Sequence, residues 1–324
     1  MVMLTVITLR GTKIMFRQLW RGSAPLTVTG LLMIPALALA IVGLIIDPRI
    51  IAGAPAWLKP AKFAVSIGVY SFTLAWIFSL IPEWTRTRRI VGWTTAVAMV
   101  LEIAIIDLQA FRGTTSHFNI STIFDAVLFT TMGAVILIQT LSTIAVAVAL
   151  WRHRFADPAL GWALRLGMTI TIIGALTGGL MTRPTTEQLE AARAGQRMTV
   201  AGAHTVGGPD GGPGLPGTGW STKHGDLRVA HFVGLHALQV LPLVAFALRR
   251  RRTQETVRVR LTLTAAASYI ALFGILMLQA VRGQSVLGPD AVTLLLLATW
   301  ALGTAAAAAA SALRPRSAHT PAVV

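Results

Sequence analysis

The chain has 324 residues, of which 54% are hydrophobic and only 12% are charged, and its formal net charge is +16. A soluble domain carries about 25% charged residues, so this composition predicts a polytopic membrane protein and excludes an ordinary soluble domain. Cysteine is absent, which excludes disulfides, a thiolate metal site and a cysteine nucleophile.

Eight stretches of the chain are apolar enough and long enough to cross a bilayer, which takes about 20 residues of helix. We therefore expect an all-α protein with eight transmembrane helices. The expected spans are residues 26–46, 61–81, 90–111, 119–150, 163–181, 229–248, 261–281 and 291–313.

Basic residues are concentrated in alternate connections, together with the two ends of the chain. The segment 1–23, the run Arg249 to Arg252 and the terminal Arg314 and Arg316 all belong to this side. Because Lys and Arg mark the cytoplasmic face, we expect an inner-membrane protein with both termini in the cytoplasm and no cleaved signal peptide. The basic excess then indicates topology and attraction to anionic membrane lipids, and argues against a nucleic-acid partner.

One long connection, residues 183–228, lies on the opposite side. Thr185 or Thr186 is expected to cap a short surface helix that reaches Arg197. Glycine and proline then dominate residues 207–220, a density that forbids a helix or strand there. We expect this segment to be either a flexible linker or a lid folded over the bundle and anchored by Trp220.

Two short motifs recur at nearly the same offset. Residues 58–63 resemble residues 227–232, and Gln109-Ala-Phe-Arg-Gly resembles Gln279-Ala-Val-Arg-Gly. They predict two parallel four-helix repeats, 1–155 and 156–324, the second of which contains the long connection. Close helix packing is expected at Gly174-x-x-x-Gly178 and at Ala305 to Ala310.

Polar residues inside a bilayer are costly, so each is a candidate for function. In this topology most of them fall near the outer face, where they can share a pocket. The candidate ligand-binding residues are Lys59, Lys62, Gln109, Arg112, Arg228, Gln239, Gln279 and Arg282. If the cations converge, they form a site for an anion, a quinone or a lipid headgroup; otherwise they reach lipid phosphate individually.

Four residues are candidates for catalysis: Glu102, Asp107, His117 and Asp125. Glu102 lies about 15 Å deeper than Arg112 on a helix, where a carboxylate relays a proton, coordinates an ion or accepts a buried hydrogen bond. The spacing of His117, Ser121 and Asp125 suggests one helical stripe on which the carboxylate orients the imidazole. A Ser/Thr-capped helix start is the alternative explanation.

His117, His231 and His236 are candidate ligands for a divalent metal or a haem, because imidazole is the commonest metal ligand. His231 and His236 lie about 140° apart around one helix, so at least one of them needs a partner elsewhere. Otherwise, each histidine hydrogen-bonds a neighbouring helix.

At residues 112–119 and 225–239 the sequence resembles a family of bacterial multi-pass membrane proteins of uncharacterised function. That resemblance implies a membrane topology and no mechanism. The layout of two four-helix halves with outward histidines is also similar to that of haem A synthases, in which paired histidines bind haem.

These observations leave three functional hypotheses. The first is a membrane enzyme or electron-transfer protein with a histidine-bound metal or haem. The second is a transporter or sensor for an anionic or lipid-like ligand. The third is a structural or assembly protein.

Overall fold

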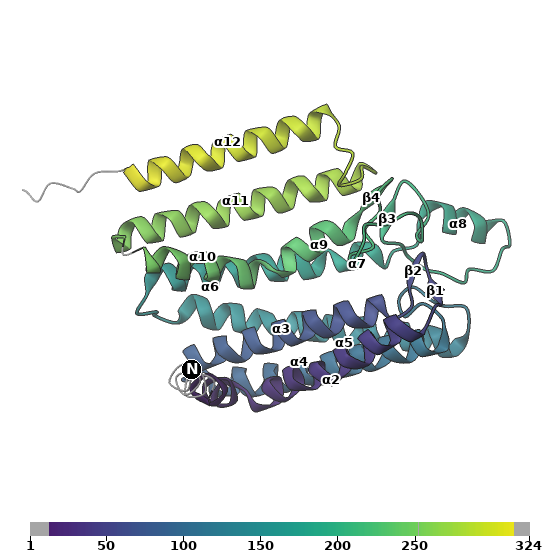
Figure 1. The fold of residues 1–324 in the computed structure, drawn as a ribbon, viewed down its shortest axis with the longest axis horizontal. Helices are drawn as coiled ribbons and strands as arrows, with labels where there is room; N and C mark the ends of the chain where they lie inside the picture. The colour runs from purple at the N-terminus through teal and green to yellow at the C-terminus, as the bar shows by residue number, and fades with distance from the viewer. Residues whose placement is uncertain (1–12, 252, 314–324) are drawn as a thin grey trace, which may run out of the picture.

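The computed structural model describes residues 13–251 and 253–313. Long helices dominate it and run roughly parallel to one another (Figure 1). Their bounds are α2 Ala24–Ile46, α3 Leu58–Leu80, α4 Thr85–Arg112, α5 Ile123–Arg152, α6 Pro158–Leu176, α9 Leu227–Leu235, α10 Ala237–Arg250, α11 Glu255–Val281 and α12 Ala291–Leu313. Residues 13–22 form a further helical stretch.

Seven of these helices are long and apolar enough to cross a membrane, and the α9–α10 pair makes an eighth span if counted as one helix bent by 48°. The expected multi-pass helical architecture is therefore confirmed. Arg10, Arg252, Arg314 and Arg316, which support the predicted orientation, lie outside the described residues.

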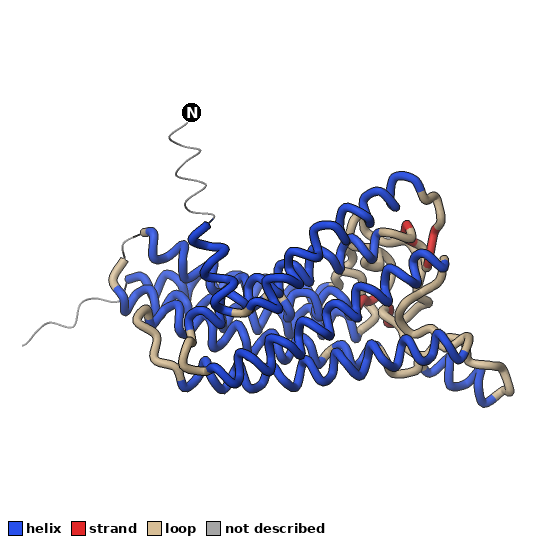
Figure 2. The backbone as a smooth tube through the Cα atoms, turned by 90° about the horizontal axis from the view of Figure 1, so that it is seen from below, coloured by secondary structure: helices blue, strands red, loops and turns tan. Residues whose placement is uncertain are grey.

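The non-helical structure gathers at one end of the bundle, which we call the loop end (Figure 2). It comprises the hairpin β1 Ile50–Ile51 and β2 Ala54–Pro55, the antiparallel pair β3 Thr205–Val206 and β4 Gly225–Asp226, and the short helices α7 Gly178–Met181 and α8 Thr186–Arg193. Residues 13 and 313 lie at the opposite end, which we call the termini end (Figure 1).

Local sequence explains where several helices start. Ser23 caps α2 and Asp157 caps α6, each just before a proline in the first turn, where the missing N–H costs nothing. Thr185 and Gln188 form a reciprocal capping box on α8, so the predicted cap is confirmed, although the helix ends at Arg193. Thr122 caps α5, which therefore begins later than the expected residue 119.

The same helix pairs pack in each half. In the first half, α2 packs on α3 and α4, α3 packs on α4, and α4 packs on α5. In the second half, α6 packs on α9–α10 and α11, α9–α10 packs on α11, and α11 packs on α12. The halves meet closely through α5 and α6.

An apolar cluster joins the two halves toward the termini end. Phe78 and Ile81 at the end of α3 are fully buried with Leu150 of α5, Leu164 of α6 and Leu238 of α10. Hydrophobic packing therefore joins the halves toward the termini end, and a second buried cluster of Phe118 with Met181, Leu227 and Ala280 joins them at the loop end.

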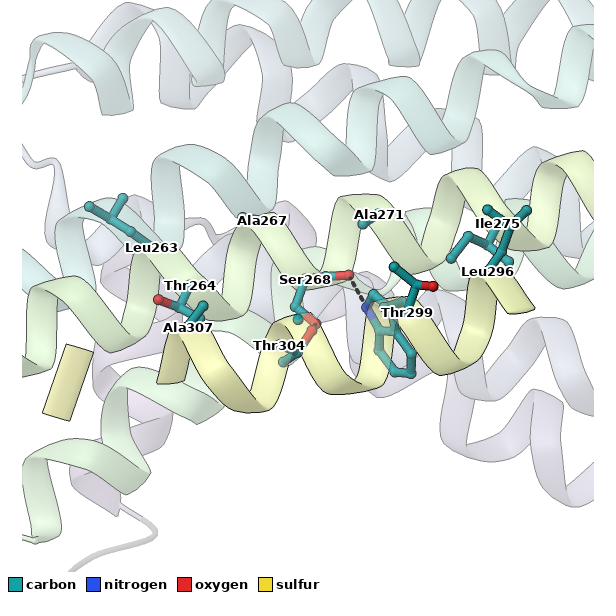
Figure 3. A pocket seen from close by; sticks show the side chains of 12 residues that line it. Leu263, Thr264, Ala267, Ser268, Ala271, Ile275, Leu296, Thr299, Thr304 and Ala307 are labelled. Carbon is teal, nitrogen blue, oxygen red and sulfur yellow. Dashed lines mark hydrogen bonds between the residues drawn. The ribbon is translucent and has the colours of Figure 1, made fainter. Parts of the chain in front are cut away.

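Helix α12 lies at the edge of the bundle and packs on α11. Hydroxyl pairs join the two helices: Ser268 to Thr304 at 2.9 Å, both of which are drawn in Figure 3, and Thr264 to Ser311 at 3.1 Å. The alanines of 305–310 are mostly exposed, so the expectation that they mark close helix packing is wrong within this chain. Helix α11 lies beside that run, since Thr304 and Ser311 on either side contact it and Ala307 lines the groove between the two helices, but it does not cover most of the alanines.

Gly174, by contrast, does mark close packing. A Cβ atom at Gly174 would lie 2.6 Å from the Cα atom of Gly234 on α9. Both glycines let the α6 and α9 backbones approach, as small residues do in membrane helices. The prediction at Gly174 is confirmed.

We predict that Gly174→Ala destabilises the protein by about 1–3 kcal/mol, the usual cost of overpacking. Gly274→Ala is the matched control, because it is also helical and a Cβ atom there meets nothing within 4 Å. Thermal unfolding of detergent-purified protein should show a lower midpoint for the first variant and an unchanged or higher midpoint for the second. Equal midpoints would refute the packing argument.

Candidate functional site

The loop end brings together the start of α3, the end of α4 and the connection 113–122. Lys59 and Lys62 lie one turn apart near the start of α3. Lys59 Nζ lies 5.8 Å from the centre of the Phe63 ring, and the His117 ring lies 5.9 Å from that same ring. Phe63 thus lies between a cation and an imidazole.

Glu102 completes this cluster from α4. One carboxylate oxygen lies 3.5 Å from His117 Nε2, and the other is buried without a hydrogen-bond partner among the described residues. Glu102 is only 3% exposed. A buried acceptor without a partner is costly, so the unpaired oxygen marks a position where a further donor would be stabilising.

The two loop histidines are held in their neutral form. Burial lowers the pKa of His117 well below its ordinary value, and the positive charges of Lys59, His204 and His231 lower it further. Burial also lowers the pKa of His204, although the Asp210 carboxylate 2.9 Å away opposes this shift. Both side chains keep partial exposure, 24% and 22%.

The Gly-rich connection folds back onto the loop end. The Thr218 carbonyl accepts a hydrogen bond from Lys62 Nζ at 2.6 Å, and the next carbonyl, of Gly219, accepts one from Arg228 at 2.7 Å. Gly217 and Gly219 have φ values of +75° and +69°, a region that favours glycine. Trp220 stacks edge-on against Phe232 of α9 at 5.9 Å.

The connection is also fixed at its middle. Asp210 accepts hydrogen bonds from the backbone N–H groups of His204 and Thr205 as well as from the His204 ring. The backbones of Gly53 and Gly211 approach so closely that a Cβ atom at Gly53 would lie 2.3 Å from the Gly211 carbonyl oxygen. These contacts fit the lid hypothesis better than a flexible linker.

The outer arginines are each paired with a local aspartate. Arg112 lies 2.6 Å from Asp125, Arg228 lies 2.6 Å from Asp226, and Arg282 lies 2.5 Å from Asp290. In contrast, neither Lys59 nor Lys62 has a carboxylate within 4.0 Å in the described part of the chain. The five candidate cations therefore divide into three neutralised arginines and two lysines without an acidic partner.

The repeated Gln-Ala-x-Arg-Gly motif has the same local structure at both places. Gln109 and Gln279 each donate to the carbonyl six residues ahead, at 3.4 and 2.8 Å, and each motif ends at a glycine with positive φ. Arg112 and Arg282 then pair with an aspartate near the start of the next helix. The glutamines and arginines of this motif close helix ends, which is a structural role.

Asp125 belongs to that helix-end network. It accepts hydrogen bonds from Gln109, Arg112 and Thr122. The expected stripe of His117, Ser121 and Asp125 on one helix is wrong, because α5 begins only at Ile123. The carboxylate that faces His117 is Glu102.

The candidate metal ligands do not come together. His231 shares a hydrogen bond with the Gly174 carbonyl at 2.8 Å, and it lies 3.2 Å from the Thr177 hydroxyl. His236 lies at the break between α9 and α10 beside the Gln239 side chain, and its Nε2 atom is buried without a hydrogen bond within 3.5 Å in the described part of the chain. Within residues 13–251 and 253–313, no three histidine or acidic side chains are placed to hold a metal ion. The metal or haem hypothesis stays a prediction without geometric support.

Two further candidates lie outside the loop-end cluster. Asp107 is half-buried, and one of its oxygens has no partner among the described residues. Gln239 donates weakly to the Thr73 hydroxyl of α3 at 3.4 Å, and its side chain neighbours that of His236, although its oxygen makes no hydrogen bond within 3.5 Å among the described residues. Gln239 therefore links the two halves, whereas Asp107 is not joined to the loop-end cluster by any contact described.

Sequence reasoning missed Phe63, Thr73, Asp210 and Thr218. Phe63 and Thr73 were recoverable in part, because Lys59, Phe63, Ser66 and Thr73 recur at helical spacing on α3. Asp210 and the Thr218 carbonyl were not, because their roles depend on how an irregular segment folds.

No protein-family model, curated protein or solved structure matches this chain. The fold by itself defines the class: a multi-pass helical membrane protein with a polar cluster beneath an ordered connection.

We predict that acid destabilises the protein through His117 and His204. Their lowered pKa values mean that, below about pH 6.5, the unfolded chain binds protons that the folded chain does not. Stability is therefore highest at neutral pH and falls toward pH 5, by up to about 1.4 kcal/mol per pH unit for each group. Thermal unfolding midpoints between pH 8 and 5 should fall less steeply for His117→Gln; an unchanged slope would refute the assignment.

Proposed function

We propose that the protein binds a small anionic ligand at its loop end, between the two halves, with Lys59 and Lys62 as the groups that attract the anion. The observation that carries this proposal is the contrast between these lysines, which lack an acidic partner within 4.0 Å among the described residues, and the three paired arginines. An ammonium group in a low-dielectric setting is stabilised by a negative partner, and an anionic ligand supplies one.

Glu102 and His117 add hydrogen-bonding groups to the proposed site. They provide a hydrogen-bond acceptor and a ring nitrogen beside the lysines. A ligand that carries an anionic oxygen together with a hydroxyl or amino donor satisfies both. Because His117 is neutral, the positive charge of the proposed site comes from the lysines.

The ordered connection supports a lid. The Thr218 carbonyl accepts a hydrogen bond from Lys62 Nζ, in the position that a ligand oxygen would take. The partial negative charge of a carbonyl oxygen makes it a weaker partner for an ammonium group than an anion is. In this proposal the ligand displaces the carbonyl, and the segment 207–220 moves when the site fills.

A chain built from two parallel four-helix repeats, 1–155 and 156–324, is consistent with a site that lies between them. The helix pairs that pack are the same in both halves, and α3 and α9 both begin at the leucine of the repeated Leu58 and Leu227 motif. A site between repeats is common in transporters, in which one repeat rocks against the other. We propose that the site serves transport or sensing of an external anion, in an inner-membrane protein with cytoplasmic termini.

The test uses protein in phosphatidylcholine nanodiscs, titrated with inorganic phosphate or acetate at constant ionic strength balanced with chloride. We expect saturable binding, and an increase of tenfold or more in Kd for Lys59→Gln and for Lys62→Gln, because a hydrogen bond to a charged group contributes about 1.5–3 kcal/mol.

Lys223→Gln is the matched control, because Lys223 is an exposed lysine at the same end of the bundle. It should bind like the native protein. Absence of saturable binding of both probes, or equal losses in Lys223→Gln and the two site variants, would refute an anion site at these lysines.

A further inference from the structure

Glu102 differs from the other deeply buried acidic residues in its lack of a basic partner. Glu102 and Asp125 are each 3% exposed and Asp226 is 2% exposed, but Asp125 and Asp226 each lie 2.6 Å from an arginine. No lysine or arginine nitrogen lies within 4.0 Å of the Glu102 carboxylate in residues 13–251 and 253–313. Because a buried carboxylate without a positive partner is costly, Glu102 has an unused capacity to bind a positive group.

The neighbours of Glu102 do not supply that positive charge. One carboxylate oxygen lies 3.5 Å from His117 Nε2, and the other is buried without a hydrogen-bond partner among the described residues. Burial lowers the pKa of His117 well below its ordinary value, so the imidazole is neutral, and its Nδ1 atom lies 3.1 Å from the Ser116 hydroxyl. The second oxygen of Glu102 is therefore available to a donor that carries a positive charge.

Uncompensated charges of opposite sign thus lie close to Phe63. Lys59 Nζ lies 5.8 Å from the centre of the Phe63 ring, and the ring of His117, which neighbours Glu102, lies 5.9 Å from it. The charges of Lys59 and Glu102 act on each other, although the two side chains form no ion pair within 4.0 Å. A ligand that holds a negative and a positive group a few atoms apart can pair with both.

Asp210, the other acidic residue that acts on Lys59, is already engaged. It accepts hydrogen bonds from the backbone N–H groups of His204 and Thr205 and from the His204 ring. Among the acidic residues that act on Lys59, Glu102 therefore has the oxygen without a partner.

We propose that the ligand of the loop-end site is an anion that also carries a primary ammonium group, with its anionic group at Lys59 and Lys62 and its ammonium group at Glu102. This inference rests on the proposed anion site and specifies its ligand class. It selects an amino donor over a hydroxyl donor, because a hydroxyl donates a hydrogen bond but leaves the negative charge of the buried carboxylate uncompensated.

The test uses small ligands that differ in a single group. Acetate, glycolate and glycine share a carboxylate, to which glycolate adds a hydroxyl group and glycine an ammonium group. Their binding is measured by calorimetry at pH 7 on protein in phosphatidylcholine nanodiscs, at constant ionic strength balanced with chloride. We expect glycine to bind about tenfold or more tighter than acetate, and about threefold or more tighter than glycolate, because it alone adds a hydrogen bond between two charged groups.

Glu102→Gln keeps the size of the side chain and removes its charge. It should reduce the advantage of glycine over acetate to less than about threefold. Acetate itself should bind this variant as tightly as the native protein or more tightly, because a nearby negative charge is gone.

Asp107→Asn is the matched control, because Asp107 is a second acidic residue of α4 with an oxygen that lacks a partner among the described residues. No contact described joins it to the loop-end cluster, so this variant should keep the full advantage of glycine. Acetate binding by both variants reports that each is folded.

A second pair of ligands distinguishes two sources of this chemistry. Glycine represents free amino acids, whereas 2-aminoethyl phosphate, compared with ethyl phosphate, represents the headgroup of an amino-phospholipid. An increase in affinity that depends on Glu102 in either pair supports the ammonium site, and the pair with the larger increase identifies the source.

The ammonium site would be overturned if neither amino ligand bound more tightly than its matched ligand without the ammonium group, or if glycolate bound as tightly as glycine. These comparisons use native protein, so they decide the question even if Glu102→Gln does not fold. An advantage that folded Glu102→Gln retains would also overturn the site.

In each of those outcomes, acetate binding that still depends on the lysines leaves the anion site standing. If neither acetate nor ethyl phosphate binding responds to Lys59→Gln and Lys62→Gln, the anion site itself fails and the ammonium inference fails with it. The two failures are therefore distinguishable.

Discussion

Two ammonium groups at the edge of the bilayer, neither with a carboxylate within 4.0 Å in the described part of the chain, are the constraint on which the loop end depends. The free energy of a charge taken out of water rises steeply unless a partner compensates it. Lys62 obtains a partial one from the Thr218 carbonyl, and this contact draws the Gly-rich segment onto the bundle. Glycines with positive φ let that segment turn tightly enough to present two consecutive carbonyls, one to Lys62 and the other to Arg228. The folded conformation of the Gly-rich connection thus depends on its hydrogen bonds to the charged side chains of Lys62 and Arg228.

The distribution of apolar packing complements this polar end. A buried apolar cluster joins the halves toward the termini end and includes Phe78, Ile81, Leu150 and Leu164. Toward the loop end a second buried cluster, in which Phe118 packs with Met181, Leu227 and Ala280, joins the halves together with hydrogen bonds such as that from Gln239 to Thr73. Apolar packing therefore joins the halves at both ends of the bundle.

The arginines and histidines show how far residue type alone can identify the members of a binding site. Arg112, Arg228 and Arg282 are indistinguishable in sequence from anion-binding residues, yet each forms a pair with an aspartate at 2.5–2.6 Å. His117 was expected to face Asp125, but the late start of α5 places it in a connection opposite Glu102. These ion pairs reduce the number of candidate anion-binding residues, because an arginine already paired with an aspartate has little affinity left for a ligand. The residues that remain are those whose charge or hydrogen-bonding capacity is unused.

The sequence by itself determined the helical membrane class, the approximate spans, the cap at Thr185 and the close approach at Gly174, because these depend on hydrophobic length, capping chemistry and residue size, which are local properties. It also placed Lys59, Lys62, Glu102 and His117 among the candidates. Only the tertiary structure decided which cations are neutralised, which carboxylate faces His117, and which segments of the two halves pack together. Those outcomes depend on contacts between residues far apart in the chain, whose distances no local pattern fixes, and on the path of a Gly-rich segment that has no periodicity to predict it.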